Sequence, residues 1–62
     1  MNVFETTDFK VFEPHVINGV TYYFVGRNKV GSGYMMSYTT KNDAIQACKT
    51  LQNAYNVGTL IM

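Results

Sequence analysis

The sequence contains very little of what usually holds a small domain together. It has one cysteine, Cys48, and one histidine, His15, in 62 residues. One cysteine excludes a disulfide within the chain, and together the two residues cannot supply the three or four ligands of a zinc site. A chain of this length buries only about 60% of its unfolded surface. We therefore expect no metal and no cofactor, and we expect support from self-association as a homodimer.

Charged residues are also scarce, at 15% of the chain against about 25% in ordinary soluble domains. The net charge is +1, with the acidic residues gathered mainly in residues 1–16. Affinity for nucleic acid grows with the number of phosphates that are neutralised, so a few scattered cations predict only weak, salt-sensitive binding. The cations beyond residue 16 are Arg27, Lys29, Lys41 and Lys49.

Long apolar runs are absent. No stretch approaches the roughly 20 residues that a membrane-spanning helix needs, and the start of the chain lacks the pattern of a signal peptide. A lone thiol fits a reducing compartment. We expect one domain, residues 1–62, encoded by a complete short reading frame and acting in the cytoplasm without a membrane.

The strongest local signal is Asn18-Gly19, which lies between the apolar-rich runs "FKVFEPHVI" and "VTYYFV". This dipeptide favours a two-residue hairpin turn, in which both residues have positive φ. The turn predicts that Ile17 pairs with Val20, and the same register continues toward the N-terminus. The further pairs that it predicts are His15 with Tyr22, Val16 with Thr21, Glu13 with Phe24, Pro14 with Tyr23 and Phe12 with Val25.

Alternation along these strands divides the side chains between two faces of a sheet. The face without charge is the better candidate for the core, and its members are Phe12, Pro14, Val16, Thr21, Tyr23 and Val25. The opposite face holds Val11, Glu13, His15, Ile17, Val20, Tyr22 and Phe24. Because proline has no amide donor, we expect the first strand to lie at an edge or to carry a bulge near Pro14.

A third strand is expected over "YMMSY", residues 34–38, followed by a helix from about Lys41 to Tyr55. Thr40 and Asp43 resemble a capping box, and Gly58 suits the left-handed cap at the other end. The small apolar residues of the helix, with Cys48 among them, form one stripe. The fold class is therefore α+β: an antiparallel sheet of three to four strands with one helix on one face, in the order β-β-β-α. The closing "TLIM" is expected to form a terminal strand or to pack into a neighbour.

The stretch "GRNKVGSG", residues 26–33, resembles a phosphate-binding loop. Such a loop needs Lys and then Ser or Thr after its last glycine, and a helix that begins there. Here Ser32-Gly33 and a strand-like run follow Gly31, so we interpret the stretch as a hairpin connection.

No set of residues predicts catalysis. His15 and Cys48 are expected on opposite sides of the sheet, which separates the two members of a nucleophile–base pair. The acidic residues near the N-terminus alternate with aromatic ones and are better explained as solvated edge residues. We therefore expect that the protein is not an enzyme.

A single helix covers one face of a sheet, so the other face is expected to be open and to bind a protein partner. Aromatic residues and Met are enriched at interfaces. The predicted partner-binding residues are His15, Tyr22, Phe24, Tyr34 and Met36. One alternative stays open, in which the N-terminal "MNVFETTDF" or the C-terminal "TLIM" folds back over this face.

From Tyr22 to about Gln52, the strands, the glycine turn and the helix start "YTTKNDAI" resemble two families of DNA-binding domains. These are the domains of AP2 type and the arm-binding domains of phage integrases, whose open sheet face reads the major groove with Arg and Lys. The open face predicted here instead carries aromatic residues with His15 and Glu13, so we transfer no functional residue.

Two functions follow as hypotheses. The first is a small non-enzymatic interaction protein of phage or mobile-element origin, which inhibits or modulates a protein partner and associates with itself. The alternative is a weak nucleic-acid-binding module of sheet-plus-helix type, which uses Arg27, Lys29, Lys41 and Lys49.

Overall fold

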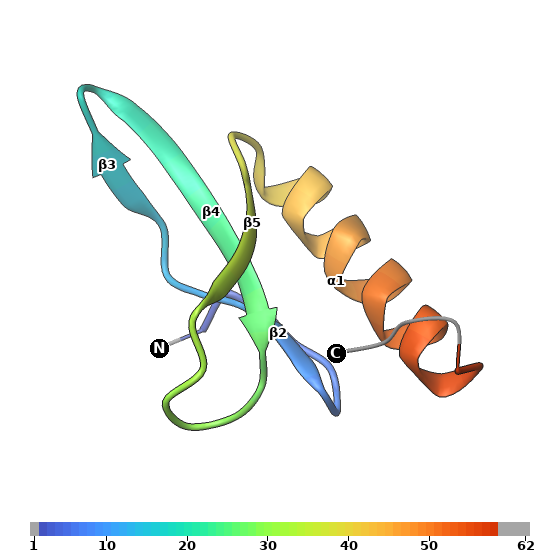
Figure 1. The fold of residues 1–62 in the computed structure, drawn as a ribbon. Helices are drawn as coiled ribbons and strands as arrows, with labels where there is room; N and C mark the ends of the chain where they lie inside the picture. The colour runs from blue at the N-terminus through green and yellow to red at the C-terminus, as the bar shows by residue number, and fades with distance from the viewer. Residues whose placement is uncertain (1, 59–62) are drawn as a thin grey trace.

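The computed structural model describes residues 2–58 and shows a five-stranded antiparallel sheet with one helix packed on it (Figure 1). The α+β prediction is confirmed, with one strand more than the upper expectation. Strand β4 pairs with β2, β3 and β5, and β1 pairs with β2. The elements are β1 (Phe4–Glu5), β2 (Phe9–Val11), β3 (His15–Ile17), β4 (Val20–Arg27), β5 (Tyr34–Tyr38) and α1 (Lys41–Asn56).

The hairpin of β3 and β4 forms as predicted. Asn18 and Gly19 both have positive φ, at 51° and 79°. The turn fixes the register next to it, so that His15 pairs with Tyr22, Val16 with Thr21 and Ile17 with Val20. The end of this hairpin extends past α1 and projects away from the rest of the molecule (Figure 1).

The predicted register fails before His15. Strand β2 pairs Val11 with Val25, whereas β3 pairs His15 with Tyr22. The first strand advances four residues between these pairs while β4 advances three, so one extra residue lies between Val11 and His15. The irregularity expected near Pro14 is therefore present. As a result Val11, rather than Phe12, is the partner of Val25, and the two residues exchange the faces that we predicted for them.

A second irregularity lies on the other side of β4. Strand β5 pairs Val25 with Met36 but Gly26 with Tyr34, so Met35 is an extra residue in the ladder. An extra residue reverses the alternation of side chains. Tyr34 and Met36 therefore lie on opposite faces of the sheet.

The first residues of the chain add strand β1 to the edge of β2, where Phe4 pairs with Val11. Val3 and Phe4 pack against the core on the side of α1, so they do not cover the opposite face. The "TLIM" segment lies outside the described residues.

The turn between β1 and β2 is held by the side chain of Gln52 in α1. Its Oε1 accepts hydrogen bonds from the Thr6 hydroxyl at 2.8 Å and from the Asp8 amide at 2.6 Å. Its Nε2 donates to the Asp8 carboxylate at 2.8 Å. One helical side chain thus satisfies several polar groups of a turn that is distant in sequence.

Helix α1 runs one residue further than predicted, to Asn56. Gly58 has the expected left-handed conformation, with φ 77°, and its amide donates to the Tyr55 carbonyl. Thr40 occupies the predicted N-cap position, but its side chain makes no capping hydrogen bond, so the predicted capping box does not form.

The core lies between α1 and the part of the sheet formed by β2, β4 and β5. Its fully buried side chains are Phe9, Val11, Val25, Ala44 and Cys48. Of the predicted core face, Val25 is buried and Tyr23 packs against the core, but Val16 is 70% exposed. Val16 is exposed because its hairpin extends beyond the helix (Figure 1).

Candidate interaction surface

Five ring side chains meet on the face of the sheet opposite α1, and we call this surface the aromatic face. Phe24 stacks on Tyr34 with ring centroids 4.5 Å apart, and His15 meets Phe24 edge-on at 5.6 Å. The Tyr34 hydroxyl lies 3.3 Å from Nε2 of His15. The members are Phe12, His15, Tyr22, Phe24 and Tyr34.

The strand register explains why these rings meet. His15 pairs directly with Tyr22, and Phe24 follows Tyr22 on the same face of β4. Tyr34 joins them because it pairs with Gly26, two residues beyond Phe24. Gly26 has no side chain, and the Phe12 ring occupies the space where a Cβ would lie.

Four of the five predicted partner-binding residues are therefore brought together: His15, Tyr22, Phe24 and Tyr34. The fifth, Met36, is not among them. It pairs with Val25 and packs against the core on the helix side, because the extra residue Met35 turns it away.

Sequence reasoning missed Phe12, which was assigned to the core. In the structure its ring meets Tyr34 edge-on at 4.7 Å, and Nζ of Lys10 lies 4.7 Å from its centroid. The only sequence signal for this placement is Pro14, which predicts an irregularity but does not say how many residues it adds.

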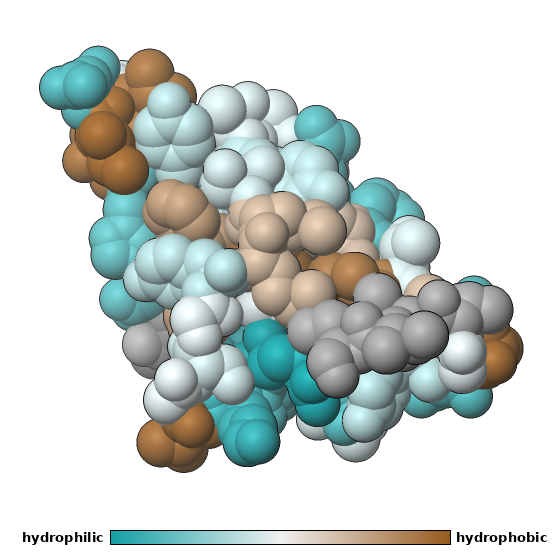
Figure 2. Space-filling model, in the orientation of Figure 1, coloured by the Kyte–Doolittle hydropathy of each residue, from teal (hydrophilic) through white to brown (hydrophobic). Residues whose placement is uncertain are grey.

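The free end of the β3–β4 hairpin is an apolar tip (Figure 2), and it extends the strands that carry His15 and Tyr22 of the aromatic face. Ile17 is 49% exposed and Val20 is 41% exposed, with Val16 on the other side of the same tip. Tyr34 is 52% exposed at the centre of the face. Such large exposed apolar residues, contiguous with aromatic ones, are typical of an interaction surface.

Arg27, one of the four predicted anion-binding cations, is used inside the fold. Its guanidinium lies 5.2 Å from the ring centroid of Tyr55 in α1 and 5.7 Å from that of Phe9. Its Nε is buried and has no hydrogen-bond partner among the described residues. This arrangement fits a cation–π contact that helps to seal the core beneath the end of the helix.

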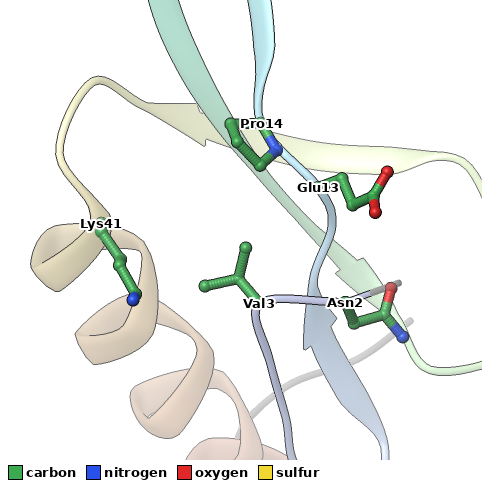
Figure 3. A pocket seen from close by; sticks show the side chains of 5 residues that line it. All are labelled: Asn2, Val3, Glu13, Pro14 and Lys41. Carbon is green, nitrogen blue, oxygen red and sulfur yellow. The ribbon is translucent and has the colours of Figure 1, made fainter.

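Of the other three cations, Lys29 follows β4, and Lys41 and Lys49 both belong to α1. Lys29 is exposed in the connection between β4 and β5, and Nζ of Lys49 lies 5.7 Å from the Phe4 ring. Lys41, at the start of α1, borders a hollow of about 450 Å³ that is also lined by Asn2, Val3, Glu13 and Pro14. Figure 3 shows Val3 between Lys41 on one side and Glu13 and Asn2 on the other.

His15 and Cys48 lie on opposite sides of the sheet, the first on the aromatic face and the second in the core. Burial raises the pKa of the Cys48 thiol, and its contact with Thr6 acts in the opposite direction. A protonated, buried thiol behaves as a small apolar side chain. Within residues 2–58 no three His, Cys, Asp or Glu side chains are grouped as metal ligands.

We expect the raised pKa of Cys48 to make the protein less stable in alkali. The buried thiol contributes fully to the free energy of unfolding below its ordinary pKa of 9.0. This contribution is lost as the pH rises toward the raised pKa of the folded state, because the thiol ionises first in the unfolded chain. Urea unfolding between about pH 8 and about pH 10 measures the effect. The free-energy difference between wild type and Cys48→Ala should shrink over this range. A constant difference would contradict the burial of the thiol.

The fold and its exposed surface thus define a small sheet-plus-helix protein with an open aromatic face. No described helix is long and apolar enough to cross a membrane. Comparison with protein-family models, with curated proteins and with solved structures finds no match.

Proposed function

We propose that this chain is a small interaction protein without enzymatic activity, which docks onto a protein partner through the aromatic face and associates with itself. The observation that carries the proposal is the cluster of Phe24, Tyr34 and His15, stacked together on a sheet face that the helix does not cover. Rings give a large contact area at a low cost in conformational entropy, which suits an inhibitor or modulator of another protein.

The limited core supports self-association. Only five described side chains are completely buried, while apolar residues at the hairpin tip remain exposed. A stable interface buries about 800 Å² on each partner, close to a fifth of the 4140 Å² surface of this chain. We place this activity in the cytoplasm, where the free Cys48 thiol remains reduced.

We expect Phe24→Asp to abolish self-association while the monomer remains folded, because it places a carboxylate at the centre of the interface. Size exclusion with light scattering over a dilution series measures the mass, and circular dichroism checks the fold. Val30→Asp is the matched control, since Val30 is 99% exposed in the β4–β5 connection and is not a member of the aromatic face. Tyr22→Ala is a second test that adds no charge.

Three outcomes oppose the proposal. A wild-type protein that is monomeric at every concentration has no self-association to explain. If Phe24→Asp is monomeric but unfolded and Tyr22→Ala behaves in the same way, the aromatic residues support the fold rather than binding. Equal loss of mass in Val30→Asp would show a general effect of charge.

Weak binding of nucleic acid is the second candidate, and one observation favours it. Lys10 lies over Phe12 at the margin of the aromatic face, and exposed rings beside a cation can stack on unpaired bases. Fluorescence anisotropy with a single-stranded oligothymidylate separates the two functions. Affinity that falls steeply with salt favours nucleic acid, whereas protein docking through the rings is insensitive to salt.

A further inference from the structure

Strand β5 has a free edge. It pairs with β4, and no other described strand pairs with it. Phe24 accepts a hydrogen bond from the Phe12 amide, so its backbone groups point away from β5. Ser37 pairs with Phe24. In an antiparallel ladder, if one residue of a pair directs its N–H and C=O away from the neighbouring strand, its partner does the same. The N–H and C=O of Ser37 are therefore directed away from the sheet.

The edge on the other side of β4 is protected in ways that β5 is not. Strand β1 has only two residues, and one of them is the charged Glu5. Further along this edge, Glu13 and Pro14 lie between β2 and β3. Charges, proline and short strands are the usual means of preventing further pairing. From Ser32 to Thr40, the chain around β5 contains neither a charge nor a proline. Its one irregularity, Met35, lies before Ser37.

A groove of about 340 Å³ lies beside this edge, between β5 and α1. Residues coloured as hydrophobic lie at the centre of Figure 2, where Figure 1 shows β5 beside α1. Met36 and Tyr38 line the groove from the strand, and Ala47, Thr50 and Leu51 line it from the helix. Asp43, in the first turn of α1, lies at the border of the groove and gives it a negative charge.

We propose that β5 and this groove bind an extended peptide segment of a partner protein by strand addition. The segment forms main-chain hydrogen bonds with Ser37 and places alternate apolar side chains in the groove, since successive side chains of a strand point to opposite faces. A basic residue of the segment faces Asp43. The groove lies on the helix side of the sheet, whereas the aromatic rings lie on the opposite face, so variants in the groove test this site alone.

The probe is a library of capped hexapeptides of the form Lys-Φ-Thr-Φ-Thr-Φ, in which Φ is Leu, Ile, Val or Phe. Amide NMR shifts and hydrogen exchange of the full chain report binding. We expect the best peptides to shift the Ser37 amide and to slow its exchange. Ser37→Pro removes the outward N–H without removing a ladder bond, and should weaken binding by about tenfold. Ser37→Ala keeps the N–H and should bind like wild type.

A second variant, Thr50→Phe, fills the groove from an exposed position on α1 and should also prevent binding. Tyr22→Ala should leave peptide binding intact, because Tyr22 lies outside the β4–β5 ladder, and this separates the proposal from the function of the aromatic face. The proposal is overturned if no peptide shifts Ser37, if the shifts lie on the aromatic face, or if Ser37→Pro and Thr50→Phe both bind like wild type.

Two other occupants of the groove would also overturn it. Nuclear Overhauser contacts from the Ala47 methyl to the Leu60 or Ile61 methyls in the free protein would show that the groove holds the chain's own end. Protection of the Ser37 amide that rises with protein concentration, without peptide, would show that a second copy occupies the edge.

Discussion

Replacing Phe9 with alanine is expected to leave the protein largely unfolded at room temperature. Phe9 is fully buried, meets the Tyr55 ring edge-on at 5.8 Å and lies beneath the Arg27 guanidinium. Removing a buried phenylalanine ring costs about 3–5 kcal/mol. At about 0.05–0.15 kcal/mol per residue, the whole domain has only about 3–9 kcal/mol of stability.

The reason for this large effect is that Phe9 joins three elements. It is part of β2, pairs with Arg27 in β4, and contacts Tyr55 near the end of α1. Its loss leaves a cavity, and Arg27 then faces that cavity with only one of its two aromatic partners, Tyr55. Circular dichroism during urea unfolding measures the effect, as a reduced midpoint or as an absent transition.

Phe12→Ala is the matched control, because it removes the same ring from the half-buried aromatic face. We expect it to cost about 1 kcal/mol. If Phe12→Ala proved as destabilising as Phe9→Ala, the two sides of β2 would contribute equally to the core. The assignment of Phe12 to the open face would then be wrong.

The second large effect is expected at Gly26. A Cβ at this position would lie 2.6 Å from the Gly33 carbonyl oxygen and 2.9 Å from Cε1 of Phe12. The backbone oxygen cannot move without disturbing the pairing of Gly26 with Tyr34. Gly26→Ala should therefore destabilise the fold by about 1–3 kcal/mol, as overpacking does elsewhere. Thermal unfolding should show a lower midpoint, by about 4–8 °C for each kcal/mol.

Gly33→Ala is the control for Gly26→Ala, because a Cβ at Gly33 meets no atom within 4 Å. It should be neutral or should stabilise the protein by about 0.4–1 kcal/mol through the unfolded state. Equal midpoints for the two alanine variants would contradict the close approach of Phe12 and Gly33 to Gly26. The same substitution at Gly26 should displace Phe12, so the aromatic face would also be altered.

Several elements could be predicted from residues close together in the chain. Asn18-Gly19 specifies the turn, because few other dipeptides accept two positive φ angles, and the turn then sets the partners of His15 and Ile17. The spacing of small apolar residues around Cys48 predicts a helix whose buried side faces the sheet. Alternation along β4 places Tyr22 and Phe24 on one face and Val25 on the other.

Other features depend on contacts between residues that are distant in sequence. One extra residue before His15 decides whether Val11 or Phe12 enters the core. In the register that forms, Phe9 and Val11 are both buried beneath α1. The extra residue Met35 likewise separates Tyr34 from Met36. Arg27 resembled a free cation in the sequence, but the end of α1 brings Tyr55 to its guanidinium.

The sequence by itself therefore determined the classes of element, the turn and most of the aromatic face, because each depends on local backbone preference or on a two-residue period. Only the tertiary structure decided which side chains the two bulges redirect and which edge of the sheet remains open. A bulge shifts the register by a single residue, and packing against the helix determines which register buries the larger apolar area.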